Sequence, residues 1–318
     1  MNLLNARLRR GHRLDHLFRQ GTRAFAWGLL AVMAAILGSL AVAASPALRK
    51  FGPGFVTSSA WNPVTEEFGA LVSIHGTLVT SAIAMFIGIP VSLGIALFIT
   101  ELCPRVLKRP LGTAIELLAA IPSIIYGMWG LFVFAPLFAE RIQPWLTGLL
   151  GPIPGIGVLF EGPPLGIGIL TAGIVLAIMV IPFMSSVIRD LFEGVPAVLK
   201  ESAYGLGATT WEVVHGVVLP YTRSGVVGGM MLGLGRALGE TMAVTFVIGN
   251  ANRIHASLLM PGNTISSSLA NQFTEAVGEI YTSSLLALAL ILFMISFVVL
   301  AGAKLLLLRI AGREGGRG

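Results

Sequence analysis

The stretch SGVVGGMMLGLGRALGETMAVTFV, residues 224–247, is apolar over most of its length but contains Arg236 and Glu240. As a helix rising about 1.5 Å per residue, it is long enough to cross a bilayer. The two charges are four residues apart, which places them on one helix face, one turn from each other. Each charge costs about 2.5–3.5 kcal/mol at the middle of a membrane helix. The pair therefore marks a conduction path, which we favour because intramembrane charges usually do so, or forms a structural ion pair.

A stripe of small residues runs beside this pair. Gly225, Gly229, Gly233 and Ala237 follow one another at intervals of four residues. Such stripes allow helix backbones to approach closely in a membrane. The stretch is therefore expected at the centre of a helix bundle.

The composition supports a membrane protein. Of 318 residues, 55% are hydrophobic and 11% are charged, which excludes an ordinary soluble domain. The net charge of +6 does not indicate nucleic-acid binding, because the basic residues lie in the gaps between apolar runs and not in blocks with aromatic residues. The single cysteine, Cys103, excludes an intramolecular disulfide framework, and no metal or cofactor site is predicted.

Apolar runs predict an all-α polytopic fold with six transmembrane helices. Prolines occur inside three of them, and Pro90 is expected to kink its helix. The predicted spans are 25–44, 76–100, 111–137, 165–187, 224–247 and 285–307. The sequence AVAAS at 41–45 resembles a signal-peptidase site, but the long basic region before it favours a retained helix.

The positive charges predict the orientation. Sixteen of the 21 Lys and Arg residues fall in the segments expected inside, against four in those expected outside. This bias places both termini in the cytoplasm. Residues 1–24 are expected to form an amphipathic segment on the inner lipid surface, and 309–318 a cytoplasmic tail. The outer segments (45–75, 138–164 and 248–284) are too short for a receptor domain, so capture of a ligand outside requires a separate protein or the bundle itself.

The inner loop 189–223 predicts two short helices. Pro196 suits a helix start, and Gly205 and Gly207 interrupt the helix that follows. Thr209 and Glu212 fit a capping box that begins a second helix, which Pro220 is expected to end.

Two functions fit such a helix–turn–helix loop. The loop has three basic and four acidic residues, and its net negative charge disfavours DNA binding. Docking to a cytoplasmic protein is the better interpretation.

At this loop the sequence resembles a known family. Glu201-Ser202-Ala203, Gly207 and Leu219-Pro220 are similar to the EAA-x3-G-x9-I-x-LP loop of bacterial ABC importer permeases, with serine at position 202 and Val217 at the isoleucine position. The resemblance implies a type I ABC importer permease core over 76–308. It also implies that the loop couples the chain to an ATPase subunit, with Glu201, Ser202, Ala203, Gly207, Leu219 and Pro220 in the coupling motif.

Three further strings, at 61–81, 116–136 and 235–250, resemble the permeases of phosphate-specific ABC importers, closer to the PstC type than to the PstA type. The resemblance implies that Arg236 and Glu240 act in phosphate passage. It implies a homologous permease (PstA type), two ATPase subunits (PstB type) that bind ATP and Mg, and a periplasmic phosphate-binding protein (PstS type). It also implies that this chain is a multi-pass protein of the bacterial inner (cytoplasmic) membrane. A guanidinium suits a phosphate oxyanion, and Glu240 is hypothesised to neutralise Arg236 in the empty site.

Other interpretations stay open beside these. Pro122, Ser123 and Tyr126 either line the path or belong to a kinked packing helix. Ser266, Ser267 and Ser268 either meet a receptor protein or form an ordinary polar loop, and Glu116 is explained by snorkelling or a local hydrogen bond. No Walker A motif or catalytic set is present, so ATP hydrolysis is assigned to another subunit.

Three other functions compete with phosphate import. The substrate could be another oxyanion, such as sulfate or molybdate. The chain could instead be an ion-coupled secondary transporter with Glu240 as its proton site, or a membrane scaffold with a structural Arg–Glu pair. The absence of a visible inverted repeat weighs against the secondary transporter.

Overall fold

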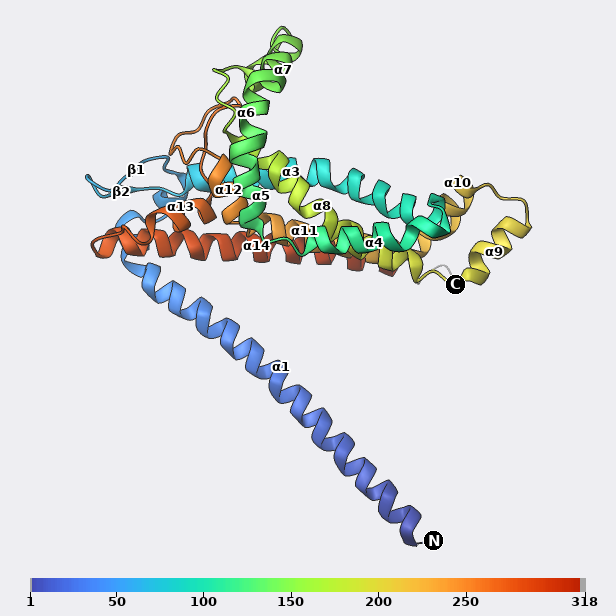
Figure 1. Ribbon diagram of the computed structural model, residues 1–318. Helices are drawn as coiled ribbons and strands as arrows, with labels where there is room; N and C mark the ends of the chain where they lie inside the picture. The colour runs from blue at the N-terminus through green and yellow to red at the C-terminus, as the bar shows by residue number, and fades with distance from the viewer. Residues whose placement is uncertain (1, 315–318) are drawn as a thin grey trace.

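The computed structural model describes residues 2–314, with side chains described for 15–305. Helices dominate this part of the chain, and four long ones run alongside each other as a bundle (Figure 1). These four are α3 (Leu71–Leu97), α8 (Ile169–Glu193), α11 (Leu219–Leu238) and α14 (Glu279–Glu314). Helix α3 packs along α8, and α11 contacts α3, α8 and α14. The main apolar core lies between α3, α8 and the short helix α12 (Met242–Val247).

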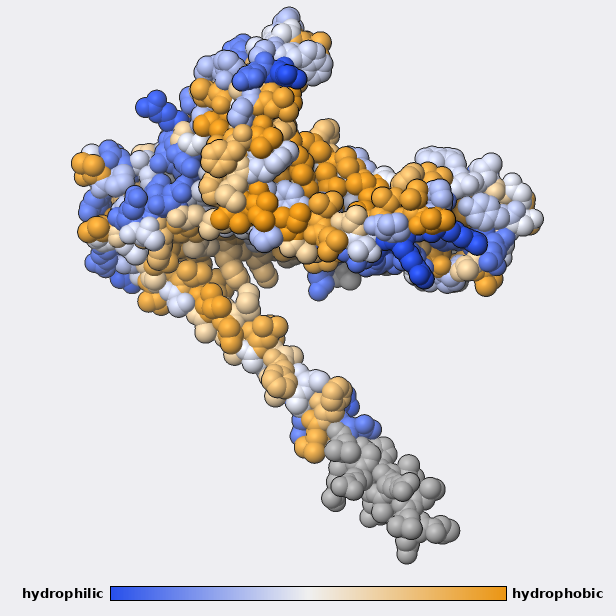
Figure 2. All heavy atoms as spheres, in the orientation of Figure 1, coloured by the Kyte–Doolittle hydropathy of each residue, from blue (hydrophilic) through white to orange (hydrophobic). Residues whose placement is uncertain are grey.

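The all-α membrane class is confirmed. Within the described residues, five helices are long and apolar enough to cross a membrane. They are Asp15–Phe51, Leu71–Leu102, Ser123–Leu150, Ile169–Glu193 and Glu279–Leu305. Figure 2 shows apolar side chains along the flank of the bundle and polar ones gathered towards its two ends. The predicted span 224–247 is wrong in its boundaries, because helix α11 begins at Leu219 and ends at Leu238. With 20 residues, α11 reaches about 30 Å at 1.5 Å per residue, but it is not among these five helices, so the count of six spans stays a prediction.

The predicted span 111–137 is wrong in its boundaries. Helix α4 (Arg105–Ala119) ends before Pro122, and a new helical stretch begins at Ser123 and continues to Leu150. Proline disfavours helical geometry in the residue before it, which explains the break. The continuous stretch comprises α5 (Ser123–Trp129), η2 (Gly130–Phe134), α6 (Ala135–Leu137), η3 (Phe138–Ile142) and α7 (Gln143–Leu150). About half of the predicted outer segment 138–164 is therefore helical.

The first helix is longer than predicted. Helix α1 (Asn2–Phe51) runs without interruption through the predicted surface segment 1–24 and the span 25–44. Most of it lies apart from the bundle (Figures 1 and 2), and Phe25 is 83% exposed. Its last turns bury Ala44 and Ala47 in a second apolar cluster with Leu285 and Leu288 of α14. A single packed end therefore anchors this helix.

Short elements connect the long helices. After α1 come α2 (Gly54–Thr57) and an antiparallel pair of strands, β1 (Trp61–Asn62) and β2 (Glu67–Phe68), in which Trp61 pairs with Phe68. The others are η1 (Phe98–Leu102), η4 (Gly157–Phe160), α9 (Ala197–Gly205), α10 (Thr210–Val213), η5 (Val214–Val218) and α13 (Ile265–Gln272). In Figure 1, α9 and α10 project from one end of the bundle, and α13 and the strands lie at the other.

Candidate functional site

The small-residue stripe of α11 packs against α8, as predicted. A Cβ atom added at Gly225 would lie 2.7 Å from Leu191 Cδ2, and one at Gly229 would lie 3.2 Å from Val187 Cγ1. At Gly233 it would overlap Met184. The absence of side chains at these positions therefore sets the distance between the two helices.

The predicted geometry of the charged pair is wrong. Helix α11 ends at Leu238, and Gly239 and Glu240 lie in a break before α12. Glycine is the usual residue at a helix end because it tolerates conformations that other residues avoid. Arg236 and Glu240 therefore do not share one helix face, and no ion pair within 4.0 Å joins them among the side chains of residues 15–305.

Arg236 lies in the last turn of α11 and is half-buried. Its guanidinium carbon is 5.3 Å from the ring centroid of Phe183 on α8, which is a cation–π distance. Its charge also interacts with the hydroxyl group of Tyr126 on α5. The guanidinium therefore contacts α8 through the ring of Phe183, and α5 lies near enough for its charge to act on Tyr126.

Glu240 has a different partner from the one hypothesised. Its Oε1 accepts a hydrogen bond of 3.3 Å from the backbone N–H of Ala243, in the first turn of α12. A carboxylate at this position satisfies a backbone donor that has no partner within the helix and is favoured by the helix dipole. In this conformation the carboxylate fixes the break between α11 and α12 and leaves Arg236 without a carboxylate partner.

Of the three possible path-lining residues, the structure brings Tyr126 to the charged site. Its hydroxyl donates to the carbonyl of Leu118 over 2.9 Å, across the break between α4 and α5. The next residue, Gly127, packs against α12, where an added Cβ would lie 3.0 Å from the carbonyl oxygen of Met242. Pro122 precedes the first turn of α5 and is exposed, and Ser123 is partly buried. Lining of a path by these residues remains a prediction.

The two short helices of the inner loop form as predicted, and we call residues 196–218 the coupling knob. Helix α9 follows Pro196, and Gly207 has a positive φ of 87°. Thr209 and Glu212 make the expected capping box: Glu212 Oε2 accepts from the Thr209 N–H over 2.7 Å, and Thr209 Oγ1 accepts from the Glu212 N–H over 3.4 Å.

The expected helix end at Pro220 is wrong. The helical path continues from α10 through η5 into α11, and Pro220 lies in the first turn of α11. The π-helical turn η5 directly before Pro220 changes the hydrogen-bond pattern of the continuing helix, and such local adjustments accommodate a proline that lacks an N–H.

The coupling knob exposes both its motif residues and several apolar side chains. Glu201, Ser202 and Gly207 are exposed, and Ala203 packs partly against the bundle. Leu206 is 90% exposed, Trp211 71% and Val198 68%. Exposed apolar groups gathered on one polar-flanked element are typical of a protein–protein contact.

One ionic contact of the coupling knob was not predicted. Lys200 Nζ lies 2.6 Å from Glu101 Oε1, and their side chains are only 18% and 7% exposed. Lys200 also donates to the carbonyl oxygen of Phe192 over 3.3 Å. These bonds join α9 to η1 and to the end of α8. Nothing in the local sequence pattern reveals a pair that is 99 residues apart.

A second ionic contact links α4 to α8. Arg189 donates to Glu116 Oε1 and Asp190 Oδ1 over 2.7 and 2.8 Å. Of the two interpretations of this charged residue in an apolar run, snorkelling or a hydrogen bond, the structure therefore supports the hydrogen bond. Together with the Glu101–Lys200 pair, this contact ties the knob end of the bundle together.

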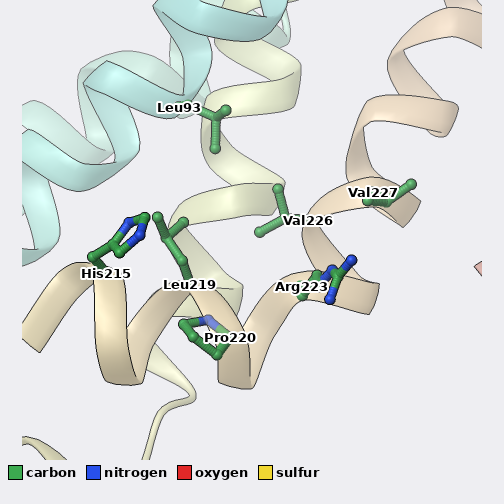
Figure 3. A pocket seen from close by; sticks show the side chains of 7 residues that line it. All are labelled: Leu93, His215, Leu219, Pro220, Arg223, Val226 and Val227. Carbon is green, nitrogen blue, oxygen red and sulfur yellow. The ribbon is translucent and has the colours of Figure 1, made fainter. Parts of the chain in front are cut away.

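A cavity of about 330 Å³ lies where the coupling knob meets the bundle (Figure 3). Leu219 and Pro220 of the motif line it, with His215, Arg223, Leu93, Val226 and Val227. The two motif residues thus lie at the joint between η5 and α11. Among the side chains of residues 15–305, no cluster of three or more His, Cys, Asp or Glu is suited to hold a metal ion.

Comparison with known proteins gives a consistent result. Residues 88–312 match the family described as binding-protein-dependent transport system inner membrane component. The chain is 57% identical over 311 residues to the phosphate transport system permease protein PstC of Mesorhizobium japonicum, covering 98% of this chain and 95% of the relative. It is 57% identical over 304 residues to the PstC of Pasteurella multocida, covering 96% and 95% of the two chains.

Solved structures agree at the level of the fold. A chain of a bacterial alginate ABC transporter, in complex with its alginate-bound periplasmic protein, has a TM-score of 0.59 at 18% identity, with 89% of this chain and 93% of that chain covered. A chain of the MetNI methionine ABC transporter has a TM-score of 0.53 at 16% identity, with 79% and 99% covered.

Proposed function

The chain belongs to the family of binding-protein-dependent transport system inner membrane components, and on that basis we propose that it is a permease subunit of an ATP-driven phosphate importer. The observation that carries the proposal is the 57% identity, over nearly the full length of both chains, to a relative named as a phosphate transport permease. The fold of the described residues is a helix bundle with an exposed coupling knob, which is consistent with this function.

Arg236 is the residue proposed to bind phosphate during passage. Its guanidinium lies over the ring of Phe183, and the carboxylate of Glu240 bonds to the Ala243 N–H and makes no ion pair with it. A guanidinium can bind two phosphate oxygens at once, which an ammonium cannot do. Glu240 is proposed to set the position of Arg236 by fixing the break between α11 and α12.

The coupling knob is proposed to transmit the ATPase cycle. Glu201, Ser202, Ala203 and Gly207 lie on its surface beside the exposed Leu206 and Trp211. These residues would contact a cleft of an ATPase subunit, which supplies ATP hydrolysis and holds the Mg ion. The chain itself is proposed to be non-catalytic.

The remaining partners follow from the proposed function. A homologous permease of the PstA type would complete the path and alternate access with this chain in the bacterial inner membrane. Two ATPase subunits of the PstB type would bind the two coupling knobs, and a periplasmic phosphate-binding protein of the PstS type would deliver the substrate.

ATP-dependent uptake of labelled phosphate by the reconstituted complex tests this function, with sulfate and arsenate as competitors. Arg236→Lys is expected to lower uptake by about tenfold or more, because a hydrogen bond to a charged group contributes about 1.5–3 kcal/mol. Arg141→Lys is the control, since Arg141 lies on η3 and is exposed.

Glu240→Gln separates two roles for the carboxylate. Glutamine keeps an oxygen that can accept from Ala243 but carries no charge. Retained uptake would support the positioning role, and lost uptake would support the charge. The proposed function fails if the complex transports sulfate but not phosphate. The proposed role of Arg236 fails if Arg236→Lys leaves phosphate uptake unchanged.

A further inference from the structure

A second basic site lies at the end of the bundle opposite the coupling knob. The loop between α12 and α13 borders a cavity of about 500 Å³ there. The cavity is lined by Trp61, Leu165, Ala251, Asn252, Arg253, His255, Met260 and Pro261. None of these residues belongs to the charged site at Arg236.

Hydrogen bonds hold this loop rigidly. The N–H of Ala251 donates to Gly262 O over 2.9 Å, which closes the loop on itself. Leu258 donates to Leu159 O over 2.9 Å and accepts from the N–H of Leu170, at the start of α8, over 2.8 Å. Because its backbone is fixed to α8, the loop presents its side chains in a preorganised arrangement.

The polar groups at the cavity are suited to an anion. Arg253 supplies a guanidinium, and no ion pair involves it among the side chains of residues 15–305. Asn252 Oδ1 accepts from Asn263 Nδ2 over 2.6 Å, which leaves the amide N–H groups of Asn252 as its remaining donors. His255 adds an imidazole. No residue that lines the cavity carries a carboxylate.

The surroundings fix this donor set further. Asn263 is buried and accepts from Ser267 Oγ over 2.6 Å, which orients the amide that holds Asn252. Ser266, Ser267 and Ser268 are themselves buried. They lie in helix α13, so the interpretations that they meet a receptor protein or form an ordinary polar loop are both wrong.

We propose that Arg253, His255 and Asn252 form a receiving site for a phosphate oxyanion as it enters the permease, before it reaches Arg236. This inference rests on the proposed function. Helix α12, with six residues, spans about 9 Å at 1.5 Å per residue, so the loop and the break at Glu240 are close neighbours along the chain. Basic groups at a channel mouth raise the local concentration of an anion.

The test uses the complete complex in vesicles with saturating phosphate-loaded binding protein. Arg253→Gln and His255→Gln are compared with Arg141→Gln, which removes an exposed arginine that does not line the cavity. We expect Arg253→Gln to lower the phosphate transported per ATP hydrolysed by about threefold to tenfold, His255→Gln to lower it less, and Arg141→Gln to leave it unchanged. In a separate titration with binding protein, the concentration that half-stimulates ATP hydrolysis should be the same for all these variants and the unmodified complex.

Three results would overturn the inference. If Arg253→Gln leaves the phosphate transported per ATP hydrolysed unchanged, the cavity does not receive phosphate. A raised half-stimulating concentration at an unchanged ratio would make the cavity a docking surface for the binding protein. An effect confined to vesicles with anionic phospholipid, and absent in zwitterionic vesicles, would assign it to a lipid headgroup. Failure of the proposed function is distinguishable, because the unmodified complex would then transport no phosphate.

Discussion

The contact between α11 and α8 and the attachment of the coupling knob are built in different ways. Helix α11 lies on α8 through Gly225, Gly229 and Gly233, whose missing side chains allow close van der Waals packing along the helix. The coupling knob is held to the bundle by an apolar cluster that includes Val213 and Val218, and in addition by the largely buried Glu101–Lys200 ion pair. Packing in a membrane spreads its energy over many weak contacts. The knob adds one ion pair to its apolar contacts, so a point mutation at that pair can loosen it while the α11–α8 contact stays intact.

The largest effect is expected from breaking the Glu101–Lys200 pair. Glu101→Gln leaves a buried ammonium without its counter-charge, which we expect to destabilise the chain by about 3 kcal/mol, at the lower end of the range for buried pairs because Lys200 is partly exposed. The thermal unfolding midpoint of the purified complex measures stability. Co-purification of the ATPase and the phosphate transported per ATP measure coupling, and both should fall.

Two controls belong to this prediction. Glu66→Gln removes the partner of Lys50 in an exposed pair at 2.8 Å, and about 0–1 kcal/mol is expected there. Glu101→Leu combined with Lys200→Met replaces both charges, and it should recover most of the lost stability because no buried charge is left alone. If the double variant is no more stable than Glu101→Gln, the unpaired charge is not what destabilises that variant.

A smaller effect is expected from filling the α11–α8 contact. Gly233→Ala adds a methyl group that overlaps Met184, and overpacking costs about 1–3 kcal/mol. Gly228→Ala is the matched control on the same helix, because nothing lies within 4 Å of its added Cβ. That variant should gain slightly from the higher helix propensity of alanine. Equal unfolding midpoints for the two variants would contradict the close packing.

The coupling knob was the region best predicted from sequence. Pro196, Gly207 and the Thr209–Glu212 capping box are local signals, and each acts on backbone within a few residues of itself. The structure has all three where the sequence places them. The error at Pro220 arose because proline usually ends a helix, whereas here the π-helical turn η5 before it lets the helical path continue.

The charged site was predicted in its residues but not in its geometry. Arg236 and Glu240 stand out in an apolar stretch, yet a spacing of four places them on one face only if the helix continues. Gly239 ends it. The partners Phe183 and Tyr126 come from two other helices, and tertiary packing alone decides which aromatic ring meets a given guanidinium. The same holds for Glu101 and Lys200.

A further effect, smaller again, is expected at the turn of the knob. Gly207 has a φ of 87°, a region that costs other residues about 1–2 kcal/mol. Gly207→Ala should therefore lower the unfolding midpoint slightly and weaken ATPase co-purification. Gly205→Ala is the control, because Gly205 lies within α9 and nothing lies within 4 Å of its added Cβ. If both variants lose the same amount of thermal stability and ATPase co-purification, the positive φ of Gly207 is not the reason for the effect.

The smallest effect is a pH dependence of the capping box. The pKa of the exposed Glu212 carboxyl is lowered by the hydrogen bonds from the backbone N–H and the hydroxyl of Thr209. Because its pKa is lower in the folded state, the carboxylate stabilises the fold above the ordinary glutamate value of about 4.3 and loses this contribution as the pH falls through the folded value. The unfolding midpoint of Glu212→Gln should therefore lie below that of the unmodified chain at pH 7 and approach it below about pH 4.

Thr209→Ala sharpens this prediction because it removes the hydroxyl donor but keeps the backbone N–H. The change of its unfolding midpoint with pH should lie between the changes for the unmodified chain and for Glu212→Gln. The reason is that the backbone N–H bond, which Thr209→Ala keeps, is the larger cause of the lowered pKa of Glu212. Midpoints measured in low salt from pH 7 to pH 3 decide the matter. A constant difference over that range would mean that the charge of Glu212 does not hold the second knob helix, and that apolar packing of Val213 and Val218 does so instead.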